Sequence, residues 1–565
     1  MRSLLTPPPA APPIPEDQIP STYQRYRWQV FTGIFIGYAA YYLLRKNIQL
    51  AGPYLTDFGF TKSDLGFAFS GVAISYGLSK FLMGTVSDRS NARNFLSIGL
   101  VITALLTILA GFFCSSAWIG DVKTTKSEHI ATVQFVEEAN SKENIAKVKI
   151  LELKPVTDAN AGANLTKMEF VENESTKGML ANENVIEVRV LKPKKTQAES
   201  AAVNKTAAES DDADVKLADV KLAVVNINES KKSSILIIWF GIQLLIGWFG
   251  GCGWPPCGRV MTHWFSLKER GRTIAVWNVA HNVGGGLIAP ITAFGVGIFG
   301  LLHWEYGVFY LPAVIAIGVA FIAWLLIRDT PQSCGLPSIE HFTNDFPPEY
   351  SEKNEQELSM YEIIFKYILN NRVLWLLGIA NAFIYLLRYG IGDWAPTYLA
   401  EAKHYDIHES AWAYFLYEFA SIPGTLICGW LRDTKFKGRH AVTSIVFMAL
   451  TIPFLLLYWL NPLDAKWLDF LSLIILGFLI YGPVMLIGVL ALEIAPKKAS
   501  GSSAGFMSVW GYFVGTAFFA NYLMGLISDK FDWDGGFIFL CAGCVLSIIF
   551  LTIAAIAHRN YQIEK

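Results

Sequence analysis

Charged residues are scarce in this sequence of 565 residues, because Asp, Glu, Lys and Arg together make up only 16% of it. A soluble globular protein has about 25%. Hydrophobic residues reach 53%, and the mean hydropathy is +0.37. The shortage of charge and the repeated apolar runs of about 18 or more residues indicate a protein that crosses a membrane many times. The net charge of −1 gives no reason to expect nucleic-acid binding.

Cysteine is sparse as well. The chain has seven cysteines, none of them in the long polar stretch 119–232, so nothing suggests a disulfide framework. Cys541 and Cys544 form a CxxC pattern inside an apolar run, where helix packing is a better interpretation than a metal or redox site. Cys252 and Cys257, in a Gly/Pro-rich run, have the same interpretation.

The sequence also lacks recognisable catalytic motifs. No nucleotide-binding P-loop, metal cluster or nucleophile–base pair stands out, so we expect neither an enzyme nor a cofactor. Transport by such a protein would depend on a solute gradient rather than on ATP. Residues 1–26 have no apolar core followed by a small-residue cleavage site, so they are not a signal peptide. Rich in proline and polar residues, they are predicted to form a disordered lead into the first helix.

Twelve apolar segments occur, six on each side of a polar stretch at 329–371. Each has about 20 to 30 residues, enough to span a hydrocarbon core of about 30 Å. The segments lie at 27–52, 63–86, 94–118, 234–262, 272–300, 303–328, 372–399, 409–432, 440–461, 467–494, 500–529 and 535–558. We therefore predict an all-α polytopic membrane protein with two six-helix halves. Its predicted parts are a tail (1–26), helices one to three (27–118), an insert (119–232), helices four to six (233–328), a linker (329–371), helices seven to twelve (372–558) and a tail (559–565).

Basic residues in the short loops predict the orientation. The second loop carries Arg89 and Arg93, and further lysines and arginines lie in the even-numbered loops at 268–272, 432–439 and 497–498. The odd-numbered loops have fewer. Both termini and the linker are therefore predicted to be cytoplasmic, and the insert extracytoplasmic.

The two halves repeat each other. The tetrapeptide YLLR occurs at 42–45 and again at 385–388. In each half a Gly-x-x-x-Asp turn with basic residues beyond it follows: Gly84, Asp88, Arg89 and Arg93 in the first, Gly429 and Asp433 in the second. This arrangement resembles the major facilitator transporters, whose substrate site lies near the membrane midplane between two such halves.

The insert breaks this pattern. It contains two related stretches, at 135–155 and 170–193, which end in the alternating, strand-like runs 148–153 and 185–191. We expect a small appendage that is β-rich or partly disordered. Its N-x-S/T sequons begin at Asn164, Asn173, Asn204 and Asn228. The sequence assigns it no partner.

Arg45 and Arg388, which end the two YLLR copies, are the strongest candidates for a binding site. An arginine deep in an apolar segment costs roughly 2.5–3.5 kcal/mol or more. Arg45 alone could be a helix-end anchor that snorkels to the interface. The match with Arg388 argues against this, and so do the neighbouring tyrosines, which are Tyr38, Tyr41, Tyr42, Tyr385 and Tyr389. Two guanidinium groups favour a phosphate over a cation or a neutral sugar, because they bind phosphate oxygens bidentately.

Two further groups could support an anion. Lys80 and Tyr76 lie four residues apart on one face of the second segment. His281 could bond to the anion and change its charge near neutral pH, although a lone histidine is more often a packed hydrogen-bonding residue.

Two carboxylates lie inside the second half. Asp393 and Glu418 either neutralise Arg388 in the empty protein or act as a charge switch or gate. The glycines at 247–258 and 284–286 are interpreted mainly as positions where helices approach each other closely.

Longer stretches of the chain resemble a known family. GWPPCGR (253–259), RDTPQSCGLP (328–337), FLIYGPVMLIG (478–488) and the sequences around both YLLR copies closely resemble the organophosphate:phosphate antiporters of the major facilitator superfamily. The resemblance runs from about residue 20 to 560, except for the insert, which has no counterpart in the family pattern. RDTPQSCGLP and LLRYGIGDW indicate the glycerol-phosphate branch.

The resemblance implies exchange of inward sn-glycerol 3-phosphate for outward inorganic phosphate by alternating access in a bacterial inner membrane. The substrate-binding residues that it implies are Arg45, Arg388, His281, Lys80, Tyr38, Tyr42, Tyr76, Trp254, Trp277, Tyr385, Tyr481 and Tyr512, and the charge-balance and gating residues are Asp393 and Glu418. We expect a monomer in the lipid bilayer. The alternatives are a hexose-phosphate:phosphate antiporter and a transporter-like organophosphate sensor.

Overall fold

The computed structural model describes residues 5–87, 90–120, 122–137, 145–155, 166–171, 185–191, 217–345, 361–494 and 500–564. The chain forms two compact units. The helical unit comprises Met1–Thr56, Thr61–Ser116 and Leu236–Lys565, and the barrel unit comprises Asp57–Phe60 and Ala117–Ile235.

The first half of the helical unit consists of long helices joined by short turns. Its elements are η1 (Glu16–Gln18), α2 (Ile19–Tyr42), α3 (Asn47–Asp57), α4 (Lys62–Ser87), α5 (Ala92–Phe113), α6 (Ser116–Ile119), α7 (Glu229–Gly250), α8 (Trp254–Trp264), α9 (Leu267–Asn278), α10 (Ala280–Phe299), η3 (Leu301–His303), η4 (Tyr306–Tyr310) and α11 (Leu311–Leu326). Helix α5 starts where the Asn91 side chain accepts a hydrogen bond from the amide of Arg93 at 3.1 Å. Buried Leu96, Leu100 and Ala104 follow at the four-residue spacing of one helix face.

A linker and the second half follow. The elements are η5 (Gln332–Cys334), α12 (Ile339–Thr343), η7 (Glu362–Leu369), α13 (Arg372–Glu401), α14 (Ile407–Thr434), α15 (His440–Leu460), α16 (Lys466–Ile494), α17 (Ser500–Ser508), η9 (Val509–Leu523) and α18 (Met524–Glu564). Helix α14 begins with a reciprocal cap, in which the side chains of Asp406 and Glu409 each accept from the other residue's amide, at 2.8 and 3.1 Å.

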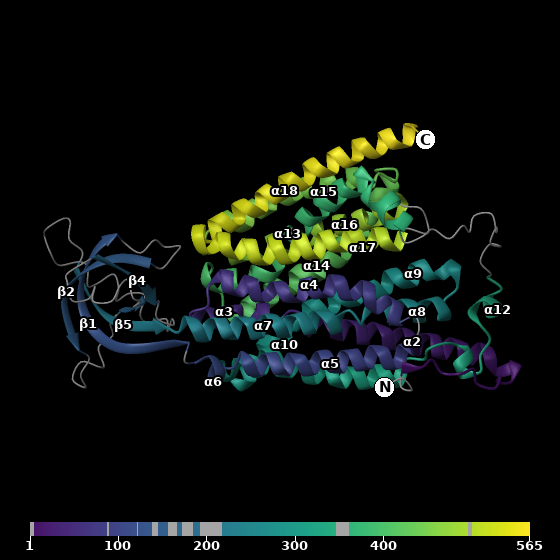
Figure 1. Cartoon of the computed structure of the whole chain (residues 1–565), viewed down its shortest axis with the longest axis horizontal. Helices are drawn as coiled ribbons and strands as arrows, with labels where there is room; N and C mark the ends of the chain where they lie inside the picture. The colour runs from purple at the N-terminus through teal and green to yellow at the C-terminus, as the bar shows by residue number, and fades with distance from the viewer. Residues whose placement is uncertain are drawn as a thin grey trace. The chain divides into compact units, whose positions relative to one another are not determined.

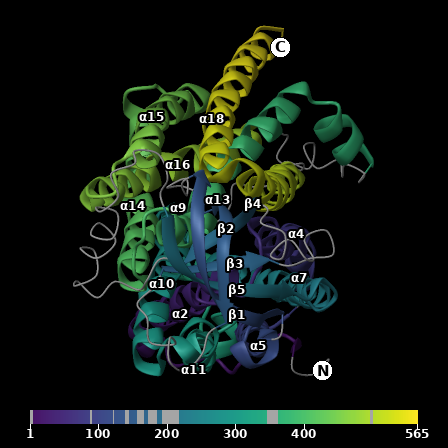
Figure 2. The ribbon, with the colours of Figure 1, turned by 90° about the vertical axis from the view of Figure 1, so that its left-hand side faces the viewer.

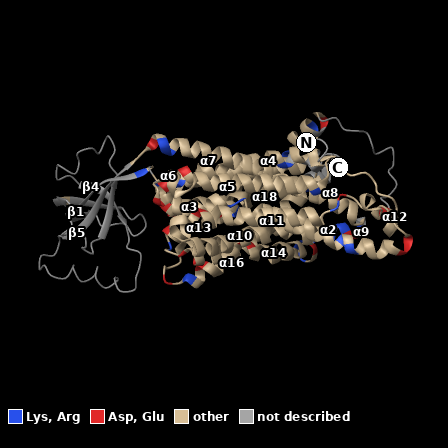
Figure 3. Ribbon diagram, turned by 90° about the horizontal axis from the view of Figure 1, so that it is seen from below, with Lys and Arg blue, Asp and Glu red and all other residues tan. Residues whose placement is uncertain are grey.

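The long helices of the helical unit run side by side, and both chain ends emerge at the same end of this unit (Figure 1). Figure 2 shows α2, α5, α10 and α11 grouped on one side and α14, α15, α16 and α18 on the other. Lys, Arg, Asp and Glu residues are concentrated at the two ends of the helical unit and are sparse between them (Figure 3). An apolar band of this kind is what a bilayer requires of the protein it surrounds.

Within the described residues, eight helices are long and apolar enough to cross a membrane. They are Ala92–Phe113, Glu229–Trp264, Lys268–Phe299, Tyr306–Leu326, Arg372–Glu401, His440–Leu460, Lys466–Ile494 and Ser502–Arg559. The last joins the predicted segments 500–529 and 535–558 across a kink, where Asp532 has a φ of 54°. The predicted total of twelve crossings stays a prediction.

Four predicted segments are interrupted; the segment 94–118 breaks only near its end, at residues 114–115 between α5 and α6. The first breaks at residues 43–46 between α2 and α3, the fourth at residues 251–253 between α7 and α8, and the fifth at Val279 between α9 and α10. Non-helical backbone at membrane depth is tolerated where it is buried in protein or lines a cavity. The breaks therefore mark where to look for a site.

The glycine triplet of α10 lets this helix touch both halves. A Cβ at Gly284 would collide with the Ala39 carbonyl of α2, and one at Gly286 would collide with the Phe419 ring of α14. These two glycines are thus packing positions, which brings α10 close to α2 and α14 at the same level.

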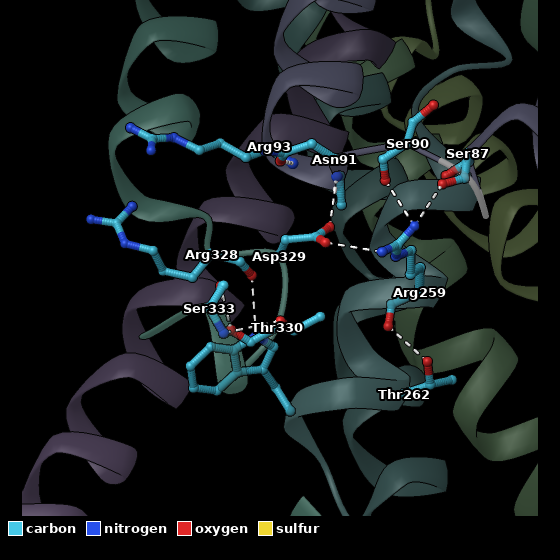
Figure 4. Close-up of polar contacts among 12 residues, drawn as sticks. Ser87, Ser90, Asn91, Arg93, Arg259, Thr262, Arg328, Asp329, Thr330 and Ser333 are labelled. Atoms are coloured by element: carbon cyan, nitrogen blue, oxygen red, sulfur yellow. Dashed lines mark hydrogen bonds and ion pairs between the residues drawn. The ribbon is translucent and has the colours of Figure 1, made fainter. Parts of the chain in front are cut away.

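Arg259 of GWPPCGR and Asp329 of RDTP form a polar network at one end of the first half (Figure 4). Arg259 donates to the carbonyls of Ser87 and Ser90 at 3.2 and 2.8 Å and pairs with Asp329 at 2.9 Å. Asp329 also accepts from the amide of Ala92 at 2.8 Å, which satisfies a free donor at the start of α5.

The two Gly-x-x-x-Asp motifs occur at the C-terminal ends of α4 and α14, and their described residues are helical rather than the predicted turns. Asp88 and Arg89 fall outside the described residues, and Gly84 lies in α4. Arg93 donates to the Trp324 carbonyl and lies over the Trp324 ring. Gly429 lies in α14, and Asp433 pairs with its neighbour Arg432 at 2.7 Å.

Residues 5–18 correct the expectation of a disordered lead. Their backbone is bonded to the rest of the first half: Asn91 donates to the Leu5 carbonyl at 2.7 Å, Ala11 to Gln332 at 2.9 Å and Ile14 to Gly335 at 3.1 Å. Helix α2 begins at Ile19, earlier than the predicted 27. A proline-rich extended segment can be held in this way because its few amides find carbonyl partners in the linker.

The barrel unit is a closed five-stranded barrel. Its strands β1 (Lys123–Glu137), β2 (Ile145–Pro155), β3 (Thr166–Val171), β4 (Val185–Leu191) and β5 (Leu217–Ile227) follow the order β1-β2-β4-β3-β5. All neighbours are antiparallel except β3 and β5. The alternating runs 148–153 and 185–191 lie in β2 and β4. Three of the sequon asparagines, Asn164, Asn173 and Asn204, lie outside the described residues, whereas Asn228 accepts from the Lys231 amide at 3.0 Å.

Candidate substrate site

Arg45 and Arg388 line one cavity between the two halves. Arg45 lies in the turn between α2 and α3, whereas Arg388 lies within the continuous helix α13. The cavity is lined by Tyr42, Arg45, Lys46, His281, Gly285, Arg388, Tyr389, Gly392, Tyr414, Glu418 and Tyr481. The two YLLR copies therefore meet from opposite halves, on different kinds of backbone.

Aromatic rings orient both guanidinium groups. The Cζ atom of Arg45 lies 3.8 Å from the centroid of the Tyr76 ring, and that of Arg388 lies 4.1 Å from the Tyr481 centroid. Cation–π attraction of this kind leaves the N–H donors unused. Arg45 donates to the Tyr42 hydroxyl at 3.4 Å. Among the described residues neither arginine forms an ion pair, and Nε of Arg388 is buried without a hydrogen-bond partner.

A buried ion pair joins the halves next to the arginines. Nζ of Lys46 bonds to Oδ1 of Asp393, and the two side chains are 11% and 2% exposed. Asp393 had been expected either to neutralise Arg388 or to act as a switch, but its carboxylate contacts Lys46. Lys46 was not foreseen, because nothing distinguishes it in the sequence except its position after Arg45.

Glu418 lies on α14, at the face that meets α10. Its carboxylate accepts from the Tyr414 hydroxyl at 3.3 Å. Ser421 lies three residues beyond Glu418 on α14, and its hydroxyl accepts a hydrogen bond from Nδ2 of Asn282 on α10 at 2.5 Å. Glu418 is buried and lines the cavity, so it adds negative charge opposite the arginines.

His281 lies at the start of α10, just after the break at Val279. Its Nδ1 bonds to the Asn278 carbonyl, and its ring centroid lies 5.6 Å from that of Tyr42. If Nδ1 carries the proton of this hydrogen bond, Nε2 can donate to an anion only when the ring is an imidazolium.

The remaining predicted residues do not line this cavity; they are Tyr38, Tyr76, Tyr385, Tyr512, Lys80, Trp254 and Trp277. Tyr512 lies at the centre of an aromatic cluster, with its ring centroid 5.1 Å from Tyr76 and 5.2 Å from Tyr385. Lys80, Trp254 and Trp277 are not among the lining residues of the cavity: Lys80 lies 5.5 Å from the Trp254 centroid, and Trp277 stacks on Tyr38 at 4.6 Å. Tyr414 lines the cavity but was not singled out in the sequence.

The halves also contact each other where α4 begins. The amides of Lys62 and Ser63 donate to the two carboxylate oxygens of Asp529 at 2.8 and 2.6 Å. Nζ of Lys62 lies 3.3 Å from Asp532 and 3.7 Å from Glu401. A carboxylate at a helix N-terminus satisfies free amides and is attracted by the helix dipole.

The loop between α13 and α14 is fixed by a buried carboxylate. Asp469 accepts from the Tyr405 hydroxyl at 2.8 Å and lies 3.6 Å from Nζ of Lys403. Lys403 also donates to the Asn461 carbonyl at 2.6 Å. Burial lowers the pKa of the Lys403 ammonium, although Asp469 opposes that change. Burial and the hydrogen bond to Asp469 raise the pKa of the Tyr405 phenol.

Residues 34–120 and 222–520 match the model of the Major Facilitator Superfamily. The chain belongs to this superfamily. It is 40% identical to the glycerol-3-phosphate transporter of Bacillus subtilis (strain 168), over 98% of each chain. Identity to the glycerol-3-phosphate transporter of Haemophilus influenzae is 36%, over 97% of this chain and 95% of the relative. Identity to a probable hexose phosphate transport protein of Chlamydia pneumoniae is 30%, over 96% and 95%.

Solved structures show the same fold. A bacterial homologue of the human lysosomal transporter Spinster, in an inward-facing and unoccupied conformation, superposes with a TM-score of 0.56 at 13% identity, over 94% of this chain and 96% of that one. The family and its bacterial relatives identify a multi-pass inner-membrane transporter, not an enzyme.

Proposed function

We propose that this transporter exchanges sn-glycerol 3-phosphate, moving inward, for inorganic phosphate, moving outward. The observation that carries the proposal is the meeting of Arg45 and Arg388 at one cavity. Among the described residues neither has a carboxylate partner, although each is held in place by a tyrosine ring. Two guanidinium groups positioned in this way suit a ligand with several anionic oxygens.

The charge around the cavity favours the same ligand. Three cations, Arg45, Lys46 and Arg388, face two carboxylates, Glu418 in the lining and Asp393 on Lys46, which leaves one positive charge in excess. A phosphate monoester carries about −1.5 to −2 at pH 7. Its arrival therefore reverses the sign of the excess charge, and an imidazolium at His281 would be stabilised by the added negative charge.

The same arginines explain why transport should be an exchange. In the proposed cycle a phosphate group binds both arginines, draws the halves together, and lets the protein rock to open on the other side. Closing a dry site around this excess positive charge would be costly, by several kcal/mol for a buried ion. The empty transporter should therefore change sides slowly, so that inward glycerol 3-phosphate is coupled to outward phosphate. Lys80, beside Trp254, is proposed to support the positive field.

Topology completes the proposal. We propose twelve crossings, cytoplasmic termini and linker, an extracytoplasmic 119–232 insert that contains strands β1 to β5, and a monomeric transporter. The basic residues of the even-numbered loops support this orientation. Labelling of single cysteines introduced into the tails and into the insert, in intact cells, tests it.

Counterflow in proteoliposomes tests the function. Vesicles loaded with unlabelled phosphate should accumulate labelled glycerol 3-phosphate, and vesicles without an internal anion should not. Stronger competition by glucose 6-phosphate than by glycerol 3-phosphate would favour the hexose-phosphate alternative. Ligand binding without flux would favour the sensor.

A further inference from the structure

Arg93 and Arg328 lie at one end of the first half, beside the network of Arg259 and Asp329. Arg93 belongs to the first turn of α5, and Arg328 follows the last residue of α11 by two positions. Figure 4 shows both side chains extending to the same side, away from Arg259. Their charges are close enough to act on each other. Because like charges repel, an anion that contacts both arginines would stabilise this arrangement.

Both guanidinium groups keep donors for such an anion. Nε of Arg93 donates to the Trp324 carbonyl, and Nη1 of Arg328 donates to the Leu325 and Ile327 carbonyls. Within the part of the chain that the structure describes, the terminal nitrogens of Arg93 and Nη2 of Arg328 donate to no residue, and neither arginine forms an ion pair. Guanidinium groups use several such donors at once when they bind a phosphate group.

Aromatic rings hold the two arginines at the level of lipid headgroups. Cζ of Arg93 lies 3.9 Å from the centroid of the Trp324 ring, and Cζ of Arg328 lies 6.0 Å from that of Tyr26. Nε1 of Trp324 donates to the Asn94 side chain at 2.9 Å, which fixes the ring. Helices α5 and α11 are both apolar enough to cross a membrane, and the arginines lie at their ends. Trp and Tyr at such ends are typical of the boundary between hydrocarbon and water.

An apolar surface continues from this pair along α11. The Phe321 ring stacks on that of Trp324 with centroids 6.3 Å apart. Phe321 and Val314 are each 61% exposed, and their seven-residue spacing puts them on one face of the helix. A soluble anion would gain nothing from this surface, whereas the acyl chains of a lipid would cover it. The occupant that fits both the charge and the apolar face is therefore a lipid.

We infer that Arg93 and Arg328 together bind the headgroup phosphate of an anionic phospholipid, whose acyl chains lie along the exposed face of α11. Basic pockets between membrane-spanning helices suit anionic headgroups in this way. Neither residue lines the cavity of Arg45 and Arg388. The lipid is thus a second ligand at a separate site, and its binding does not depend on which solute the protein transports.

Native mass spectrometry of the full-length protein in detergent, titrated with phosphatidylglycerol or phosphatidylcholine, tests this site. The wild-type protein should retain one phosphatidylglycerol more tightly than phosphatidylcholine. An arginine near anionic lipid contributes about fivefold to affinity. Arg93→Gln/Arg328→Gln should therefore weaken retention of this lipid by about 25-fold. Phosphate affinity should stay unchanged in this variant, which also reports that it is folded.

Lys437→Gln/Arg439→Gln is the matched control. These two exposed residues precede α15, at the corresponding place in the second half, and the control removes the same amount of charge. Within the described residues neither of them lies over an aromatic ring. The control should retain phosphatidylglycerol as the wild-type protein does. An equal loss in both double variants would overturn the inference, because it would mean that the lipid follows the overall charge of this end.

A photoactivatable phosphatidylglycerol keeps the test valid if the double arginine variant fails to fold. In the wild-type protein reconstituted in vesicles, the label should accumulate at the start of α5 and the end of α11, and not at the start of α15. Equal labelling of all three helix ends would contradict the proposed site. Release of the lipid by inorganic phosphate at constant ionic strength would also contradict it, because the pair would then belong to a soluble anion.

Discussion

Replacing Arg388 by lysine tests the two-arginine site most directly. The substitution keeps the positive charge, but it removes the planar fork and the buried Nε donor, which has no hydrogen-bond partner among the described residues. A hydrogen bond that involves a charged group contributes about 1.5–3 kcal/mol. Loss of one such bond to phosphate weakens binding by about 10- to 150-fold. We expect phosphate affinity to fall at least about tenfold, with a corresponding loss of exchange at low phosphate concentration.

The assay is phosphate binding by calorimetry in detergent, followed by phosphate:phosphate exchange in proteoliposomes. Arg328→Lys is the matched control, because Arg328 donates to the Leu325 and Ile327 carbonyls at 2.8 and 2.9 Å and is not a lining residue of the cavity. It should behave as the wild-type protein does. Normal phosphate affinity in Arg388→Lys would refute the proposed site.

A double-mutant cycle extends this test to Arg45. If Arg45 and Arg388 hold the same phosphate, the effects of Arg45→Lys and Arg388→Lys should be non-additive by about 0.5–3 kcal/mol. Strict additivity would mean that each arginine acts on a different ligand or at a different step.

Three other contacts give sharp expectations. Lys46→Ala or Asp393→Ala alone should lower the free energy of unfolding by about 3–5 kcal/mol, because each substitution leaves a buried charge uncompensated. The double variant should lose less stability than either single variant. Asp529→Ala should widen the distance between spin labels on α4 and α18, because it removes the acceptor of two amides at the start of α4. Tyr405→Phe should lower the free energy of unfolding by about 1.5–3 kcal/mol, because it removes a hydrogen bond to buried Asp469. Phosphate affinity should not change.

Each of these expectations can fail. A double Lys46/Asp393 variant that is less stable than both single variants would mean that the two residues do not form a pair in the membrane. An unchanged distance between the spin labels on α4 and α18 in Asp529→Ala would mean that other contacts hold these two helices together. For Tyr405, Tyr522→Phe is the control, because Tyr522 is exposed and forms a ring contact with Phe518. An equal loss of stability in Tyr405→Phe and Tyr522→Phe would mean that the hydrogen bond from Tyr405 to Asp469 does not stabilise the loop.

The repeat was the most informative part of the sequence. Two YLLR copies at matched places in two similar halves predicted that Arg45 and Arg388 face each other, and both line one cavity. A charged side chain inside an apolar segment is costly, which is why we expect both arginines to lie where they can bind a ligand. The resemblance to the organophosphate:phosphate antiporters was confirmed by relatives that cover nearly the whole chain.

The features that could not be predicted from the sequence depend on the local conformation of the backbone. The break at 251–253 has a visible cause, because Gly251 and Gly253 flank it and Pro255 follows. The break at 43–46 contains neither glycine nor proline, so tertiary contacts must fix it. Lys46 could be recognised as a partner of Asp393 only once that break was known. Residues 5–18 could not be placed from the sequence for the same reason, because they are held by backbone hydrogen bonds to residues far away in the sequence.

The two arginines are alike in sequence but differ in how they are held. Arg388 is carried by α13, whose backbone is continuous, so it moves only with that helix. Arg45 lies in the turn before α3, and the next residue, Lys46, pairs with Asp393, which lies five residues beyond Arg388 on α13. One helix thus carries one arginine and restrains the turn that carries the other. A ligand that binds both arginines connects the turn at 43–46 to α13, as the ion pair between Lys46 and Asp393 does. Ligand binding and the approach of the two halves are therefore directly coupled.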